Sequence, residues 1–296
     1  MNDIVQATGA DVNLFADNTS VCVTDSTASG LQLKLQATVD RLAAWFASWA
    51  LTVNGKKSAF MIFTTKRSVP SVSISIAGEP ISHVLTHKHL GLTFDCRLSW
   101  SAHTAAMITK VSWRIGMLRR LRHRLPSLAI RSLYIASVRL ALEYAAVAWC
   151  GVLSGEVQRL ERMQRSAARL IAGVLQSDGL PHDILLARAG LEPHHLRRQA
   201  ACAVFAYSLY TRDQDLPPHM TAALASWHAR LSKPSSSVVL RSSQSSLQRL
   251  PRPRTELFRR SPFYLSFSLL NSVPPDQSTS VSSIPSFFLS PLPRQS

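Results

Sequence analysis

The first hundred residues carry the alternating hydrophobic pattern of short strands, interrupted by one helical stretch. Two β-prone runs at residues 12–15 and 20–23 flank the turn Ala16-Asp17-Asn18-Thr19, and such a turn between apolar runs predicts a β-hairpin. Between residues 31 and 50, apolar side chains recur every three or four positions, which predicts a helix. Shorter apolar runs predict further strands at residues 51–54, 59–63, 71–77 and 89–94.

After residue 100 the spacing of hydrophobic residues becomes helical. Gly173 and Gly190 stand where helix C-caps are expected, and Pro193 suits the first turn of the last helix. The sequence therefore predicts an α+β fold in which a small mixed unit precedes an all-helical one. The helices are predicted at residues 103–124, 127–149, 156–172, 183–189 and 193–210.

The segment from residue 232 to the end has a different composition. It contains 19 Ser and nine of the 16 Pro of the chain, which is typical of weakly ordered segments. Aromatic and aliphatic residues gather at 257–273, so we expect this stretch to dock onto the folded protein. Disorder is expected beyond about residue 275.

Charge narrows the range of partners. The 296 residues include 33 Lys and Arg against 17 Asp and Glu, a net charge of +16, while residues 1–60 are slightly acidic. An excess of this size favours a polyanion, either nucleic acid or an anionic membrane surface. No apolar run reaches the roughly 18 residues of a membrane span. We therefore expect nucleic acid and no membrane.

Four isolated cysteines and a polar N-terminus indicate the compartment. The cysteines form no CxxC pair, so neither a zinc site nor a disulfide framework is predicted. The first residues lack the hydrophobic core of a secretory signal. These features suit a reducing, intracellular compartment.

Asp17 is the first candidate for chemistry. A tight turn projects its carboxylate beyond the predicted strands, where it can bind Mg²⁺ together with a second carboxylate and the phosphates of a nucleotide. An Asp-Asn pair in a turn is by itself usually only a turn, so the interpretation depends on the elements that follow.

Those elements give the chain a resemblance to a known family. Trp45, Trp49, Asn54 and Lys57 recur in the order W..W.L..N..K[TS], and the segment HKHLGLTFDCRLSW follows at residues 87–100. Together with Phe15-Ala16-Asp17-Asn18, they resemble the reverse transcriptases of non-LTR retrotransposons, in particular the jockey-like mobile elements. Further similar segments are LRRLR (118–122), LEY (142–144), LERMQR (160–165) and PRPRTE (251–256).

The resemblance implies a domain organisation. Residues 1–100 correspond to a partial polymerase palm with an antiparallel sheet and one helix. Residues 101–231 correspond to a helical, thumb-like domain, and 232–296 to a C-terminal segment. The implied partners are an RNA template and a DNA primer or target, and the implied cofactor is Mg²⁺. The implied location is the nucleus, the cytoplasm or both.

Site roles also follow from the resemblance. The turn at Asp17 and Asn18 is similar to the F/Y-A-D-D catalytic turn of the family, with Asp17 as the metal ligand. Lys57 matches a lysine that assists proton donation to the leaving pyrophosphate, a general-acid role, although a lysine in a surface turn is ordinary.

Two departures from the family pattern concern activity. The family needs a second Asp on an earlier strand, and neither Asp3 nor Asp11 stands in such a context. In addition, Asn18 replaces the second Asp of the turn. We therefore expect a polymerase fragment that is inactive alone. The alternatives are a non-catalytic nucleic-acid-binding protein derived from a mobile-element relic, and a translated relic without function.

A basic region follows the predicted palm. Nine Lys or Arg and no Asp or Glu lie between Arg97 and Arg139. A thumb holds a duplex by its phosphates without reading sequence, and arginines suit this contact; the alternative is a solvated basic face without a partner. A second basic run, from Arg249 to Arg260, has the same two interpretations and also resembles a localisation signal. The predicted nucleic-acid-binding residues are Lys110, Arg114, Arg119, Arg120, Arg122 and Arg124.

Aromatic and imidazole side chains are assigned structural roles. The histidines at 83, 87, 89, 194 and 195 lack neighbouring Cys or carboxylate ligands in the sequence, so we interpret them as structural or solvent-facing. The tryptophans at 45, 49, 100, 113 and 149 are predicted to be core residues rather than base-stacking platforms.

Overall fold

The computed structural model describes residues 3–211, 259–273 and 283–289. Within it the chain divides between Leu98 and Ser99 into two compact units, each of which is considered by itself. Helices and short strands mix in the first unit, and helices alone make up the described part of the second. The predicted α+β fold class is confirmed.

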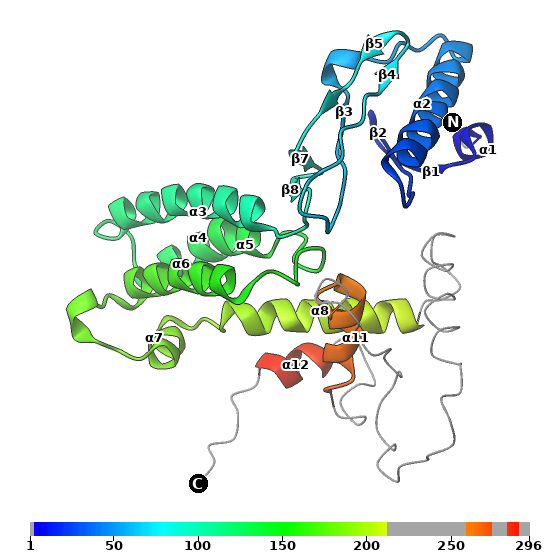
Figure 1. Ribbon diagram of the computed structural model, residues 1–296. Helices are drawn as coiled ribbons and strands as arrows, with labels where there is room; N and C mark the ends of the chain where they lie inside the picture. The colour runs from blue at the N-terminus through cyan, green and yellow to red at the C-terminus, as the bar shows by residue number, and fades with distance from the viewer. Residues whose placement is uncertain (1–2, 212–258, 274–282, 290–296) are drawn as a thin grey trace, which may run out of the picture. The chain divides into compact units, whose positions relative to one another are not determined.

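A hairpin and a long helix form one end of the N-terminal unit (Figure 1). After the short helix α1 (Ile4–Thr8), strands β1 (Asp11–Phe15) and β2 (Asn18–Cys22) pair antiparallel, and α2 (Ala28–Ser48) follows. Alternation along a strand turns one face of the hairpin towards α2. Val12 and Val21 on that face pack against the buried residues Ile4, Leu42 and Trp45.

The rest of this unit is built from very short strands. A second core forms where α2 contacts them, and the Gln36 amide exchanges two hydrogen bonds with the Ser75 backbone, at 2.8 and 3.0 Å. The buried residues of this core are Val39, Ile62, Val72, Ile74 and Ile76. The elements are η1 (Gly55–Lys57), β3 (Ala59–Phe60), β4 (Ser75–Ile76), β5 (Glu79–Pro80), β6 (Ser82–His83), β7 (Thr86–His89) and β8 (Leu92–Asp95).

Strand pairing differs from the single antiparallel sheet that the sequence predicted. The described strands form four separate two-stranded ladders, and one of them, β3 with β6, is parallel. The predicted strand at 89–94 is wrong, because Leu90 and Gly91 adopt positive φ angles and turn the chain into the hairpin β7–β8. The predicted strand at 51–54 is also wrong: Leu51 still hydrogen-bonds the Phe46 carbonyl at 2.9 Å, and Asn54 caps η1.

The second unit is a helical assembly around Tyr134 and Trp149, both fully buried. Gly173 and Gly190 end their helices in the left-handed conformation, as predicted. The predicted helix 127–149 is interrupted: a π-helical segment follows its first turns, and the helix ends at Glu143. The elements are α3 (Ser101–Leu121), α4 (Ser127–Leu133), η2 (Tyr134–Arg139, the π segment), α5 (Leu140–Glu143), α6 (Ser154–Ala172), η3 (Gln176–Asp178), α7 (His182–Ala189) and α8 (His194–Thr211).

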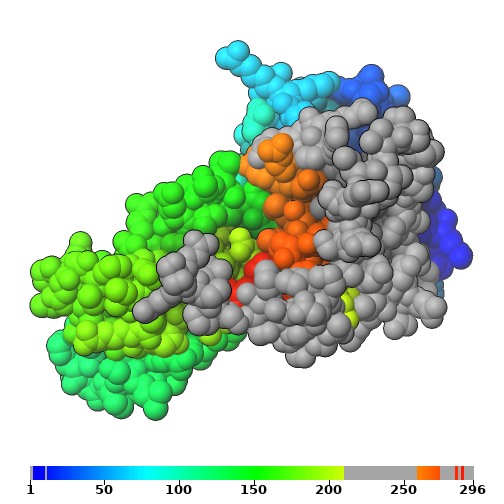
Figure 2. Space-filling model, turned by 90° about the horizontal axis from the view of Figure 1, so that it is seen from below, coloured from blue at the N-terminus to red at the C-terminus, as the bar shows by residue number. Residues whose placement is uncertain are grey.

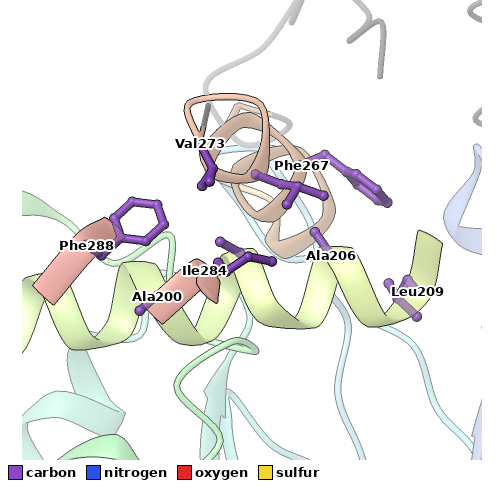
Figure 3. Packing of buried hydrophobic residues seen from close by; sticks show 9 residues of the cluster. Ala200, Ala206, Leu209, Phe267, Val273, Ile284 and Phe288 are labelled. Carbon is purple, nitrogen blue, oxygen red and sulfur yellow. The ribbon is translucent and has the colours of Figure 1, made fainter. Parts of the chain in front are cut away.

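Two C-terminal helices pack on α8: α11 (Pro262–Leu270) and α12 (Ser283–Leu289) (Figure 3). Small residues of α8 let them approach closely, and Figure 2 shows both helices reaching the surface of this unit. The buried cluster comprises Ala200, Ala203, Ala206, Leu209, Phe267, Leu270, Val273, Ile284 and Phe288.

The predictions for the C-terminal segment are confirmed only in part. Docking of the aromatic stretch is confirmed for residues 259–273. Residues 283–289 form a helix where disorder was expected, because Ile284 and Phe288, one helical turn apart, bury their side chains in the cluster. The basic run at Arg249, Arg252 and Arg254 lies outside the described residues.

Candidate functional site

Asp17 lies at the tip of the β1–β2 hairpin. Phe15 pairs with Asn18, so Ala16 and Asp17 form a two-residue loop, and Ala16 takes the positive φ of 53° that such loops require. Asp17 is exposed, and its Oδ1 accepts a hydrogen bond of 3.3 Å from the Asn18 amide. The predicted hairpin is therefore confirmed, and the sequence prediction that the turn presents this carboxylate to solvent agrees with the structure.

The neighbouring carboxylates do not gather at this tip. Asp3 accepts a hydrogen bond of 3.2 Å from the Trp45 indole, and this bond lowers the pKa of Asp3. Asp11 pairs with Cys22 at the other end of the hairpin, about 13 Å along the strand from Phe15. Asp25 forms an ion pair of 2.8 Å with Lys34. These positions explain why Asp17 stands apart.

A pair of Mg²⁺ ions does not fit this donor set. Each Mg²⁺ is usually held by one or two carboxylates plus substrate phosphates, and a two-metal site needs carboxylates that bridge. The tip offers one carboxylate and one neutral amide. Within the described ranges, no cluster of three His, Cys, Asp or Glu side chains suited to a metal is found.

Lys57 belongs to a different turn. The Asn54 side chain caps η1 by accepting the Lys57 backbone N–H at 3.1 Å, and Gly55 lies so close to Glu79 that a Cβ would meet its Oε2 at 2.6 Å. This packing fixes the backbone at Lys57 and leaves its side chain exposed. Among the described contacts, none joins Lys57 to Asp17, so the predicted proton-donor role stays a prediction.

Helix α3 presents the predicted basic face. Its apolar stripe is buried as expected, at Met107, Val111, Ile115 and Leu118. The exposed cations spread around the solvent-facing side of the helix: Lys110 and Arg119 are nine residues and hence about 180° apart, on its two edges, and Arg120 lies between them. Lys110, Arg119, Arg120 and Arg124 are exposed, while Arg114 and Arg122 are half-buried.

Arg114 has a structural contact. Its Nη1 donates to the Ser137 carbonyl in the π segment, which ties α3 to η2. The π geometry is visible at Leu140, whose N–H bonds the carbonyl of Ile135, five residues back. Of the six predicted residues, Arg114 is therefore the one for which the described contacts include a hydrogen bond within the protein.

An open groove runs between α3 and η2. Its walls come from these two elements and from Leu133 at the end of α4, and its volume is about 390 Å³. The Trp113 side chain at its rim is 64% exposed, so the prediction that Trp113 is a core residue is wrong, as it is for Trp49. Trp45, Trp100 and Trp149 are buried, as predicted. The groove is lined by Trp113, Arg114, Met117, Leu118, Leu121, Leu133, Ala136 and Ser137.

The sequence held a signal for Trp113 that was overlooked. Trp113 lies three residues after Lys110 and seven before Arg120, so all three fall on the arc of α3 that faces away from the buried stripe. Charge pairing distinguishes this arc further. Among the described residues, no carboxylate pairs with Lys110, Arg119 or Arg120, whereas other arginines of the unit are neutralised within it.

Two carboxylates between helices, Glu143 and Glu161, have lowered pKa values. Burial opposes ionisation of Glu143, but hydrogen bonds from His194 and Arg197 outweigh it and lower its pKa to about 2. Burial acts likewise on Glu161, where the side chain and the backbone N–H of His195 lower the pKa to about 2. The expectation that His194 and His195 are structural agrees with their contacts. The folded chain brings Glu143 and Glu161 beside them, partners that the sequence did not predict.

Comparison with known proteins finds relatives among transposon polymerases of Drosophila melanogaster. The probable RNA-directed DNA polymerase from transposon BS is 27% identical over 161 residues, which cover 53% of this chain and 18% of that protein. The RNA-directed DNA polymerase from mobile element jockey is 26% identical over 164 residues, or 54% and 18%. The probable polymerase from transposon X-element is 26% identical over 136 residues, or 45% and 15%.

The chain is a distant, partial match to these polymerases. The resemblance inferred from the motifs is thereby confirmed. The match spans less than a fifth of the length of each of these relatives. No protein-family model and no solved structure matches the chain. Within the described residues, no helix is both long and apolar enough to cross a membrane.

Proposed function

We propose that the chain is part of an RNA-directed DNA polymerase of a jockey-like mobile element. Its N-terminal unit is the part of the palm that carries the catalytic turn, and its helical unit is the thumb that holds the RNA template and DNA primer. Such an enzyme works inside the cell, in the nucleus or the cytoplasm.

One observation carries the nucleic-acid part of the proposal. Helix α3 exposes Lys110, Arg119 and Arg120 without a described carboxylate partner, in a stretch that contains no acidic residue between Arg97 and Arg139. Cations that remain unpaired on a rigid helix are free to displace counterions from phosphates, which supplies most of the affinity of non-specific binding. Arg122 and Arg124 follow at the end of the same helix and extend the contact.

Binding to an RNA–DNA hybrid tests this role. The triple variant Lys110→Ala, Arg119→Ala, Arg120→Ala should bind about 10- to 100-fold more weakly at 0.1 M salt, and equally so for unrelated sequences. The matched control removes three exposed cations elsewhere: Lys66, Arg162 and Arg188. Equal losses in both variants would point to net charge alone and contradict a specific role of α3.

A second candidate follows from the hairpin tip. One carboxylate, Asp17, stands there beside the neutral Asn18, which supports a non-catalytic nucleic-acid-binding role derived from a mobile element. We propose that the 296-residue chain extends no primer alone. Primer extension on an RNA template with Mg²⁺, with the palm and fingers of a jockey-like polymerase joined in front of the chain, separates the candidates: synthesis that disappears in Asp17→Ala favours the polymerase fragment, and binding without synthesis favours the second candidate.

A further inference from the structure

Trp113 combines three properties on one face of α3. Its indole is 64% exposed, it stands at the rim of the groove, and it lies on the same arc as the exposed cations Lys110 and Arg120. Along the helix axis Lys110 is about 4.5 Å and Arg120 about 10.5 Å from Trp113, on opposite sides. Trp113 is not an isolated apolar residue on this face, because Met117 and Leu133 of the same groove are also exposed. An exposed apolar patch rimmed by charged residues is typical of a ligand-binding groove.

We propose that Trp113 is a stacking platform for an unpaired base of the bound nucleic acid. This inference rests on the proposed function, because it assumes that α3 contacts the template–primer. Stacking on an aromatic ring is tolerant of sequence, since every base has a π face. Lys110 and Arg120 contact the phosphates that flank this base.

The groove accommodates the stacked base beside Trp113. Met117, Leu121 and Leu133 supply apolar walls, and Arg114 lines the same groove. Arg114 uses one N–H on the Ser137 carbonyl, which fixes its guanidinium at the wall. A guanidinium has five N–H donors, so others are available to a polar base edge.

The base that stacks on Trp113 must be unpaired, which limits the form of nucleic acid that can bind there. Inside a duplex the base faces are covered by their neighbours in the stack, and a base of a terminal pair is held by its partner, so only a single-stranded overhang offers an unpaired base to the groove beside Trp113. Charge argues against another copy of this chain as the occupant, because two such cationic faces repel each other. The predicted ligand is therefore a hybrid with an unpaired template overhang.

The experiment compares two substrates with the full chain. An RNA–DNA hybrid with a single-stranded RNA overhang and a blunt hybrid of the same paired length are titrated by fluorescence anisotropy. Trp113→Ala should weaken binding to the overhang substrate by roughly 5- to 150-fold and leave the blunt hybrid unchanged. Trp113→Phe should retain most of the affinity. Trp49→Ala, at another exposed tryptophan in the other unit, is the matched control and should change neither.

Each result has a distinct meaning. A Trp113→Ala loss that is equal for both substrates, or absent for both, overturns the stacking role while the proposed function stands. If the wild-type chain binds neither substrate in a salt-dependent manner, the proposed function fails and the inference with it. If Trp113→Ala changes the oligomeric state of the chain in sedimentation but does not affect overhang binding, this face joins copies of the chain. If an acidic amphipathic peptide binds through Trp113 without competing with the overhang, the face binds a protein partner. Both outcomes overturn the proposal. Circular dichroism verifies that each variant is folded.

Discussion

Gly151 provides a sharp test of how the C-terminal helix α11 docks. A Cβ at residue 151 would lie 2.0 Å from the backbone carbonyl oxygen of Arg260, and backbone cannot rotate away as a side chain can. Gly151→Ala must therefore shift the chain just before α11. That helix contributes the buried side chains of Phe267 and Leu270 to the cluster on α8.

The expected change in the free energy of unfolding depends on how far the substitution displaces α11. Overpacking of a well-packed contact typically costs about 1 to 3 kcal/mol. Complete undocking of α11 would expose Phe267 and Leu270, each contributing about 1.5 to 3 kcal/mol when buried. We therefore expect Gly151→Ala to lower the free energy of unfolding of the helical unit by about 1 to 3 kcal/mol if the contact is only strained, and by about 3 to 6 kcal/mol if α11 undocks completely.

Urea denaturation of the full chain, followed by circular dichroism, measures this change. Limited proteolysis reports local release, because an undocked segment near residue 260 is cleaved before the rest unfolds. Gly155→Ala is the matched control: no atom lies within 4 Å of its added Cβ, and alanine suits the start of α6. Unchanged stability and cleavage in Gly151→Ala would refute the close approach of Arg260.

Two further predictions concern the stability of the protein at low pH and its catalytic activity. The pKa values of Glu143 and Glu161 in the folded chain lie below the value near 4.5 of the unfolded chain. Their contribution to stability is therefore complete above pH 4.5 and is lost as the pH falls towards 2. We expect a loss of about 1 to 3 kcal/mol per carboxylate, a range that allows for screening by the water that both side chains still contact. Urea midpoints measured from pH 6 to 2.5 test this, and Glu161→Gln should flatten the curve; an unchanged slope would contradict the role of this carboxylate. In primer extension, Asn18→Asp should not create activity in the 296-residue chain, since Asp3, Asp11 and Asp25 do not gather at the tip; template-dependent synthesis by this variant would show that the tip binds metal more completely than the geometry implies.

The hairpin and the helix caps could be predicted from sequence because their signals are local. Asp17-Asn18 between alternating runs fixes a turn, and Gly173 and Gly190 adopt a conformation that other residues rarely take. Pairing between distant segments is not local: nothing near Ala59 specifies that β3 pairs in parallel with β6. The number and pairing of the strands therefore differed from the prediction.

The parts of the candidate site that have local sequence signals could be predicted. The parts that depend on contacts between distant residues could not. The apolar stripe of α3 identifies which cations face away from the core, but Arg114 forms its bond with Ser137, 23 residues away, through a π segment that has no sequence signature here. Trp113 was assigned to the core by residue type, although its position between Lys110 and Arg120 contradicts that assignment. Pairing of Glu143 with Arg197 likewise depends on helices that meet only in the folded chain.

The salt dependence of hybrid binding tests the central claim most directly. For the full chain, the logarithm of the association constant for an RNA–DNA hybrid should fall linearly with the logarithm of salt concentration. Each phosphate contact contributes roughly one unit of slope, so the variant lacking Lys110, Arg119 and Arg120 should reduce the slope by about 2 to 3. The control variant lacking Lys66, Arg162 and Arg188 should keep the wild-type slope. A wild-type slope near zero, or identical slopes for the wild type and the α3 variant, would contradict the assignment of α3 as the phosphate-binding face.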